Sequence, residues 1–268
     1  MTMQLSKNRL ACAFANALFL AVCLTASILA AAEPPKTAPA VELDGHGLAM
    51  QLSSMEPVES SEIHGTLCIK LKRTRSEAPF VCKVIRRDST WESVFQALAT
   101  GKTAAETLVI IHTSGAPIRY LYAKAQSPTN TLVEPQPISA EKAAVTAFAG
   151  SDYSLADLGL DFLHWPSQER LRGRTRLNRA CYVLESRNDR ATEIVRVRSF
   201  IDQEYAGTLG SQGFPAILVA EAYNLKNEMV KEFSLHGSSF KKVDGHYRLE
   251  QMEITNLKTG SQTTMKFN

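Results

Sequence analysis

From Ile63 onward, apolar and polar residues alternate with a period of two, the pattern of half-buried β-strands. The first run of this pattern predicts five short strands, at residues 65–73, 79–87, 90–98, 106–113 and 118–124. A second run predicts seven more, at residues 168–176, 179–186, 193–203, 215–225, 230–235, 247–256 and 263–267. Turn-forming residues such as Asn188-Asp189 and Thr259-Gly260 separate these strands, so we expect successive strands to pair in antiparallel hairpins.

Residues 138–165 interrupt the strands with a helical insert. Its first predicted helix covers residues 139–149 and stops at Gly150, a favourable C-terminal cap. A second begins at Ser154, where Asp157 completes a capping-box pattern, and ends before Pro166. It places three apolar residues on one face, Leu155, Leu158 and Phe162. A short amphipathic helix is also expected within residues 43–55.

The number of strands predicts the fold class. A run of about 11–12 hairpin-linked strands cannot stay flat and must curl. We therefore expect a mainly β (α+β) protein, a strongly curved, unclosed antiparallel β-barrel covered by two or three helices. The expected unit is a single domain over residues 42–268, with the helical insert at 138–165.

The N-terminus has a different pattern, in which Lys7 and Arg9 precede a long uncharged run from Leu10 to Ala32. These features predict a secretory signal peptide at residues 1–32, cut after Ala32, and a Pro-rich leader at 33–41. An uncleaved membrane anchor is the alternative, because the run is long enough to span a bilayer. Lipidation at Cys23 is disfavoured because Val22 stands where a lipidation motif has a small residue.

Charge and composition exclude two classes of protein. The chain has 30 Lys and Arg and 27 Asp and Glu, and two of the basic residues and none of the acidic ones fall in residues 1–32. The exported protein is therefore close to neutral, unlike a nucleic-acid binder with its clustered basic surface. With 44% hydrophobic residues it is also unlike a disordered chain.

Three cysteines remain after export, namely Cys68, Cys82 and Cys181. An odd number in an oxidising compartment leaves one thiol free or paired between chains. Cys68 and Cys82 could close a hairpin, which would stabilise the protein by roughly 3 kcal/mol. The alternation of apolar residues also allows a register in which the two side chains face opposite sides, so the pairing stays open.

The sequence contains no recognisable catalytic or metal-binding motif. Its six histidines are scattered, with neither a His-Glu-x-x-His nor a Cys-x-x-Cys pattern. The glycine-rich stretch from Gly207 to Gly213 leads into a strand and not into a helix, so a phosphate loop is not expected. Because no Gly-x-Ser-x-Gly sequence is present either, we expect no metal, no cofactor and no enzymatic activity.

Large apolar residues on the strands and the insert are candidates for lining a cavity, because a barrel of this size can enclose one. The candidate lipid-binding residues are Trp91, Phe95, Tyr120, Tyr122, Leu155, Leu158, Phe162, Trp165, Tyr223 and Phe233. A further feature is the alternation of four arginines along one predicted strand, which predicts a solvated basic face or a surface for an acidic partner: Arg170, Arg172, Arg174 and Arg176.

The order of several segments resembles the outer-membrane lipoprotein-sorting (LolA-like) family. The likeness is strongest after Gly150 and is carried by residues 151–158, 173–186, 195–202, 220–224 and 249–256. The resemblance implies a helix-covered half-barrel that holds the acyl chains of a lipoprotein during periplasmic transport. In carriers of this family an arginine ties the helical lid to the barrel, a setting that Arg86 and Arg87 do not match.

The resemblance thus implies a periplasmic carrier of lipid or lipoprotein acyl chains, moving them toward the outer membrane. Its partners would be the acyl chains and the membrane-bound sorting machinery, with no role for nucleic acid. One alternative is a periplasmic sensor or scaffold of the same fold that binds a protein through an edge strand or the arginine-rich strand. A small hydrolase built from dispersed polar residues is the other.

Overall fold

The computed structural model describes residues 43–57, 59–100, 103–127, 134–191, 193–203, 217–235, 239–243 and 246–268. The expected signal peptide (1–32) and leader (33–41) lie outside these residues, as does the glycine-rich stretch 207–213. None of the helices in the described ranges has the length and apolar character needed to cross a membrane.

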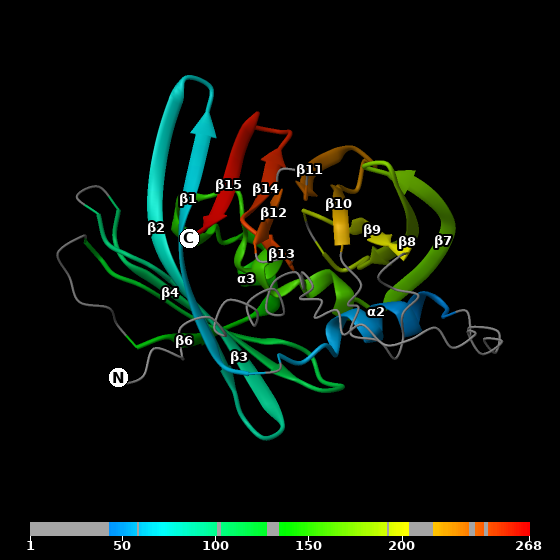
Figure 1. Ribbon diagram of the computed structural model, residues 1–268, viewed down its shortest axis with the longest axis horizontal. Helices are drawn as coiled ribbons and strands as arrows, with labels where there is room; N and C mark the ends of the chain where they lie inside the picture. The colour runs from blue at the N-terminus through cyan, green and yellow to red at the C-terminus, as the bar shows by residue number, and fades with distance from the viewer. Residues whose placement is uncertain are drawn as a thin grey trace, which may run out of the picture.

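Thirteen of the described strands form one antiparallel sheet (Figure 1), in the order β6-β5-β4-β3-β2-β1-β15-β14-β11-β10-β9-β8-β7. A separate hairpin pairs β12 (Phe240–Val243) with β13 (His246–Leu249). The strands of the large sheet are β1 (Ser61–Leu71), β2 (Thr74–Arg86), β3 (Thr90–Ala97), β4 (Glu106–Thr113), β5 (Arg119–Lys124), β6 (Gln136–Ile138), β7 (Ser167–Arg176), β8 (Arg179–Arg187), β9 (Arg196–Asp202), β10 (Ile217–Tyr223), β11 (Met229–Ser234), β14 (Gln251–Asn256) and β15 (Ser261–Phe267).

The last strand of the chain joins the two halves of this sheet. β15 pairs with β1 on one side, with Met265 opposite Leu67, and with β14 on the other. The sheet therefore runs without interruption from β6 to β7, and those two strands are its edges within the described part of the chain. It curves around the helices, as Figure 1 shows. The expected fold, a curved and unclosed antiparallel barrel covered by helices, is confirmed.

Five short helical segments lie against the inner face of the sheet, meaning the face that carries Phe80, Phe95 and Phe233. They are α2 (Gly45–Ser53), α3 (Ala140–Val145), η2 (Phe148–Gly150), α4 (Leu155–Gly159) and η3 (Asp161–His164). α2 packs beside edge strand β7 and against η3. The other four belong to the helical insert predicted between the two runs of strands.

The predicted helix at 154–165 forms only in part. Ser154 and Asp157 make the expected capping box, in which each side chain accepts a hydrogen bond from the other residue's backbone N–H. The α-helix then ends at Leu160, whose φ of 53° lies in the left-handed region. Phe162 consequently belongs to the following 3₁₀ turn, and the single continuous face expected for Leu155, Leu158 and Phe162 is wrong.

Two details of the strands also differ from the prediction. β6 contains Pro137, which lacks an N–H, but it is an edge strand and so needs no donor on its outer side. The expected strand 247–256 is divided in two at Glu250, so that its first part pairs with β12 and its second with β11 and β15.

All three cysteines of the described residues are free. In the β1–β2 ladder Cys68 lies opposite Glu77, whereas Cys82 lies opposite Ile63. The two thiols are therefore five register positions apart along the hairpin, and the disulfide left open by the sequence does not form. Burial raises the pKa of the Cys82 thiol, which keeps it protonated and unreactive.

The four arginines of β7 do not share one face, contrary to the expectation. A β-bulge between Leu171 and Arg174 shifts the register against β8 by one residue and exchanges the faces. Arg170 consequently turns inward over the ring of Tyr182, at 4.4 Å. Arg176 lies on the other face, where it binds Glu221 and Glu232.

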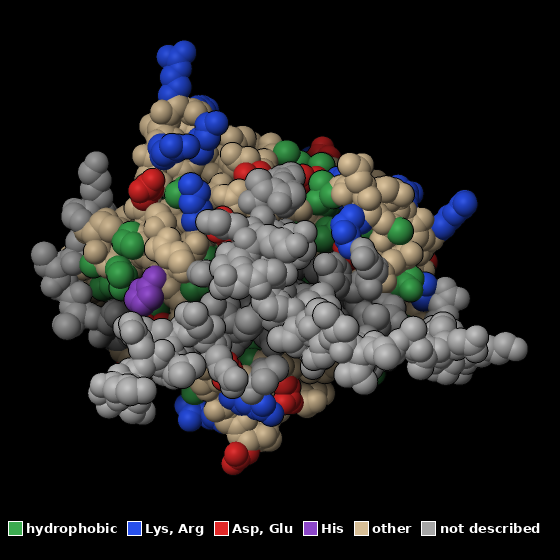
Figure 2. Space-filling view, viewed as in Figure 1, with side chains coloured by type: hydrophobic (Ala, Val, Ile, Leu, Met, Phe, Trp, Pro, Cys, Tyr) green, Lys and Arg blue, Asp and Glu red, His purple; other side chains and the backbone are tan. Residues whose placement is uncertain are grey.

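Exposed basic side chains gather elsewhere, at the tip of the β1–β2 hairpin, which extends beyond its neighbours (Figures 1 and 2). They are Lys70, Lys72, Arg73 and Arg75.

Candidate functional site

One end of the helical insert is tied to the sheet by buried polar bonds. Glu106 is 2% exposed and accepts hydrogen bonds from the Ala149 amide at 2.9 Å and from the Tyr122 hydroxyl at 2.8 Å. Asp152 accepts from the hydroxyls of Ser261 and Thr263 on β15. We call this segment, residues 148–153, the anchored segment.

The segment that follows, residues 154–165, is also tied to the sheet, and we call it the covering segment. Lys231 on β11 reaches Asp157 at 2.7 Å, and the Tyr120 hydroxyl donates to Asp161 at 3.3 Å. The Gln168 amide donates to the carbonyl oxygens of Phe162 and Trp165. Side chains of the sheet and of edge strand β7 therefore hold this segment from both sides.

A hollow of about 520 Å³ opens beside the covering segment. Its walls come from α3, the covering segment, the 188–194 connection and the inner face of β9 and β10. The apolar residues of its lining include Phe162, Trp165, Ile194, Val197 and Ala222. This volume lies within the range of pockets that bury a small ligand. We call it the outer hollow.

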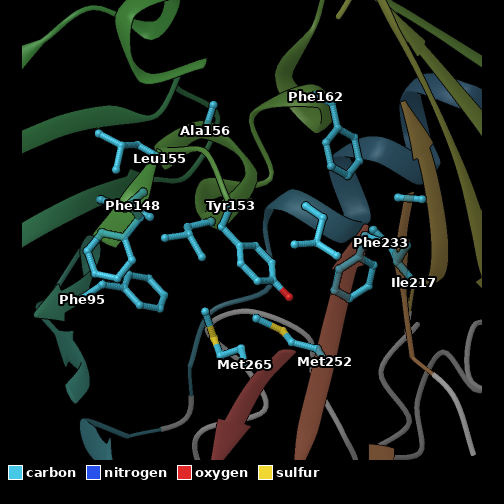
Figure 3. Packing of buried hydrophobic residues seen from close by; sticks show 14 of the residues in the cluster. Phe95, Phe148, Tyr153, Leu155, Ala156, Phe162, Ile217, Phe233, Met252 and Met265 are labelled. Carbon is cyan, nitrogen blue, oxygen red and sulfur yellow. The ribbon is translucent and has the colours of Figure 1, made fainter. Parts of the chain in front are cut away.

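A second, smaller pocket of about 40 Å³ lies deeper, between the covering segment and the sheet. Four residues line both spaces, so the outer hollow and this inner pocket meet at Asp157, Phe162, Val197 and Ala222. Figure 3 shows the Phe162 ring projecting from the covering segment toward the sheet. The remaining apolar wall of the inner pocket is Leu158, Leu160, Ala220, Phe233, Met252 and Ile254.

Asp161 is the partly buried acid of this site. Its carboxylate accepts from the Trp165 indole N–H at 2.9 Å and from the Tyr120 hydroxyl. Burial raises the pKa of Asp161, although both hydrogen bonds oppose that shift. Burial also lowers the pKa of the adjacent His164. Asp161 therefore joins the rim of the hollow to β5 through Tyr120 and fixes the orientation of Trp165.

Four of the candidate residues read from the sequence line these spaces: Leu158 and Phe233 the inner pocket, Trp165 the outer hollow, and Phe162 both. Two others, Phe95 and Leu155, lie in the packed core with 0% exposure. Phe95 packs edge-on against Phe148, with the ring centroids 6.1 Å apart.

The other four candidates lie away from both spaces. Tyr120 and Tyr122 use their hydroxyls to hold the insert, through Asp161 and Glu106. Trp91 stacks on His112 near the start of β3, with the ring centroids 3.5 Å apart.

The structure places Tyr223 away from the cavity wall, because its neighbour Ala222 lies on the inner face of β10. It lies on the opposite face beneath Arg196 and donates to Glu221.

Several wall residues were missed by reasoning from the sequence. Met252 and Ile254 alternate with polar residues along β14, so the same period of two that revealed the strands could have placed them. Lys231 shares a face with Phe233 by the same rule. Tyr153 gave no such signal, because it precedes the helix and belongs to no periodic element.

The core also contains a buried serine–histidine contact. The Ser93 hydroxyl lies 3.5 Å from His112 Nε2, and Ser93 is 0% exposed. Burial and nearby His164 lower the pKa of His112 to about 3, which makes it a weak base at neutral pH. Because Ser93 is shielded from solvent and His112 is so weak a base, their contact is a structural one. Within the described ranges, no group of three or more His, Cys, Asp or Glu side chains is arranged to hold a metal ion.

Comparison with solved structures identifies the fold. A DUF1329 family protein from Desulfovibrio piger superposes with a TM-score of 0.61 at 17% identity, covering 84% of this chain and 90% of that one. A protein described as an outer membrane lipoprotein-sorting domain, from Vibrio parahaemolyticus, gives 0.58 at 17% identity over 78% and 83%. A LolA superfamily protein from Nitrosomonas europaea gives 0.48 at 14% identity over 85% and 92%.

Sequence comparison adds the family. No curated protein matches the chain significantly. A family model described as an uncharacterized protein matches residues 128–268, which is more than half of the chain and includes the whole covering segment. The chain therefore belongs to this uncharacterized family, and it has the fold of the outer-membrane lipoprotein-sorting proteins that its sequence resembles.

Proposed function

We propose that this protein is a carrier that binds an acyl chain of a lipid or lipoprotein in the outer hollow and the inner pocket. The observation that supports it is the junction of the two spaces at Phe162, beneath a short segment that the sheet holds mainly through side chains. An acyl chain entering from the outer hollow would displace the Phe162 ring and continue along Val197 and Ala222 toward Met252. The mechanism is burial and release, with no chemical step.

The energetics favour such a reversible site. Each acyl CH₂ removed from water contributes roughly 0.8 kcal/mol, so a lipid tail gains much from even a partial sleeve. Part of that gain is offset because the chain must replace contacts that Phe162 and Leu158 already make with the sheet. Moderate affinity follows, as a carrier that must deliver its cargo requires.

The proposed place of action is the periplasm. The expected signal peptide at 1–32 would export the protein, and the Pro-rich leader would separate the binding unit at 42–268 from the cleavage site. We therefore place the carrier in the periplasm, with a membrane-bound donor or acceptor of lipid as its partner. Intact mass of the exported protein tests this: a start near Glu33 is expected, and a retained 10–32 segment or a lipid on Cys23 would contradict it.

Native mass spectrometry of the exported protein, purified without detergent, tests the carrier itself. We expect bound species whose mass increments match acyl lipids and which dissociate on gentle activation. Added fatty acid should restore them after delipidation. A protein that neither retains lipid nor takes up added lipid would instead fit the alternative, a scaffold of the same fold that binds a protein partner.

A further inference from the structure

Tyr153 carries a buried hydroxyl without a hydrogen-bond partner among the described residues. The residue is 2% exposed and precedes the capping residue Ser154. Figure 3 shows its ring extending from the insert toward the sheet, with the hydroxyl directed at Phe233 and Met252. Buried hydroxyls nearly always have partners, because an unpaired one loses its bonds to water without replacement.

This hydroxyl belongs to a residue that lines the inner pocket. Tyr153 lines the inner pocket together with Lys231, and the rest of the wall except Asp157 is apolar. Asp157 accepts from the Ser154 amide and the Lys231 ammonium through Oδ2, both at 2.7 Å, and makes no hydrogen bond to the Tyr153 hydroxyl. Tyr153 therefore directs an unused donor into the space where the proposed acyl chain would end.

The Tyr153 hydroxyl is protonated and can therefore donate a hydrogen bond. Burial raises the pKa of Tyr153 well above its ordinary value, and the nearby carboxylates of Asp157, Glu253 and Asp152 add to the shift. The phenol thus stays neutral and keeps its proton at any physiological pH. Lys231 adds a positive charge on the same wall, and an ammonium has three donors of which Asp157 occupies one.

We propose that the Tyr153 hydroxyl is a ligand-recognising donor that binds an acyl carbonyl oxygen, belonging either to a free carboxylate or to a lipid ester. This assignment rests on the proposed carrier function and names the chemical group that the carrier selects. For a free fatty acid, the inner pocket holds the carboxyl end and the outer hollow holds the rest of the chain; for a lipid ester, both the acyl chain and the headgroup would have to extend from the inner pocket into the outer hollow. An alkyl chain without oxygen gains nothing from Tyr153.

The test compares wild-type protein with Tyr153→Phe, both exported and delipidated, in fluorescence titrations with three probes. The probes are cis-parinaric acid, its methyl ester and the oxygen-free dye diphenylhexatriene. Tyr122→Phe is the matched control, because its hydroxyl is already used by Glu106 and lies outside both spaces. Since Tyr153→Phe removes an unpaired buried hydroxyl, we expect its Tm to equal or exceed that of the wild type.

The expected result is an affinity for the oxygen-bearing probes about three- to tenfold weaker in Tyr153→Phe, with binding of diphenylhexatriene unchanged. Weakening of the acid alone assigns the site to a free carboxylate, and weakening of the ester assigns it to a lipid ester. Equal affinities for all three probes in wild type and variant would overturn the assignment and indicate that a buried water satisfies the hydroxyl. A wild type that binds no probe would instead refute the carrier function.

Discussion

The anchored segment and the covering segment are consecutive pieces of one insert, yet they meet the sheet in different ways. Under Phe148 of the anchored segment the sheet is close-packed: Phe148 and Phe95 are both 0% exposed, and the Glu106 carboxylate accepts a hydrogen bond from the Ala149 backbone. Under the covering segment lie a pocket and a hollow, and its ties reach across as side chains, such as Lys231 to Asp157.

The difference separates stability from binding within about twenty residues. Close packing resists any change of volume, so a ligand cannot enter beneath Phe148, whereas Tyr153 at the other end of the anchored segment lines the inner pocket. In the covering segment, Leu158 and Phe162 border the inner pocket, so a ligand that enters there replaces only part of the contacts of this segment. The left-handed residue Leu160 divides it into two short turns, α4 and η3.

The largest loss of stability is expected from truncating Phe148, the packed aromatic residue of the anchored segment. Phe148→Ala should lower the free energy of unfolding by about 3–5 kcal/mol, because it leaves a cavity in a fully buried site. Urea denaturation followed by tryptophan fluorescence measures this loss. A change below about 1 kcal/mol would mean that the anchored segment is not the rigid half of the insert.

Phe162→Ala should behave differently from Phe148→Ala. The ring is 9% exposed and borders two spaces, so it is packed on fewer sides and its truncation should cost only about 1 kcal/mol. Removing it should also alter the uptake of a fluorescent fatty acid. A large loss of stability with unchanged probe binding would show that Phe162 completes an ordinary core.

Lys231→Met tests the tie between the covering segment and β11. Losing the ion pair with Asp157 should cost less than about 1 kcal/mol, since methionine retains the apolar part of the lysine side chain. Uptake of diphenylhexatriene should become faster in stopped-flow mixing, because the segment is held less firmly. Lys124→Met, which removes an ion pair to Glu106 at the anchored segment, should leave the rate of uptake unchanged.

Asp161 should produce the smallest effect, and it depends on pH. Because burial raises its pKa, the folded protein binds more protons than the unfolded chain between the ordinary value, about 4, and the raised one. Its contribution to stability therefore falls as the pH rises through that window. Nearby His164, whose pKa is lowered, contributes the opposite slope at higher pH.

The comparison of wild type with Asp161→Asn isolates this contribution. The difference in free energy of unfolding, measured by urea denaturation at several values between about pH 4 and pH 6, should shift in favour of the variant as the pH rises. A difference that stays constant over this range would show that Asp161 titrates normally.

Strand periodicity predicted the sheet because each strand buries one face, and a period of two records that burial locally. Only some of the aromatic residues predicted from this periodicity line the candidate site. Tyr223 satisfied the same local pattern as Phe233, but a side chain on a strand of a curved sheet can face either side. Which side faces the helices depends on the register with β9, a contact between distant residues.

Short-range sterics and hydrogen bonds specify the order and kind of most elements, from the alternating strands to the capping box at Ser154, and these could be predicted from the sequence. The separation of the β7 arginines at a bulge and the distance between Cys68 and Cys82 depend on strand pairing, which the structure alone reveals. The tertiary structure alone brought Tyr153 and Lys231 to one pocket wall. Such contacts depend on the register between strands that are far apart in the sequence, and no local pattern encodes that register.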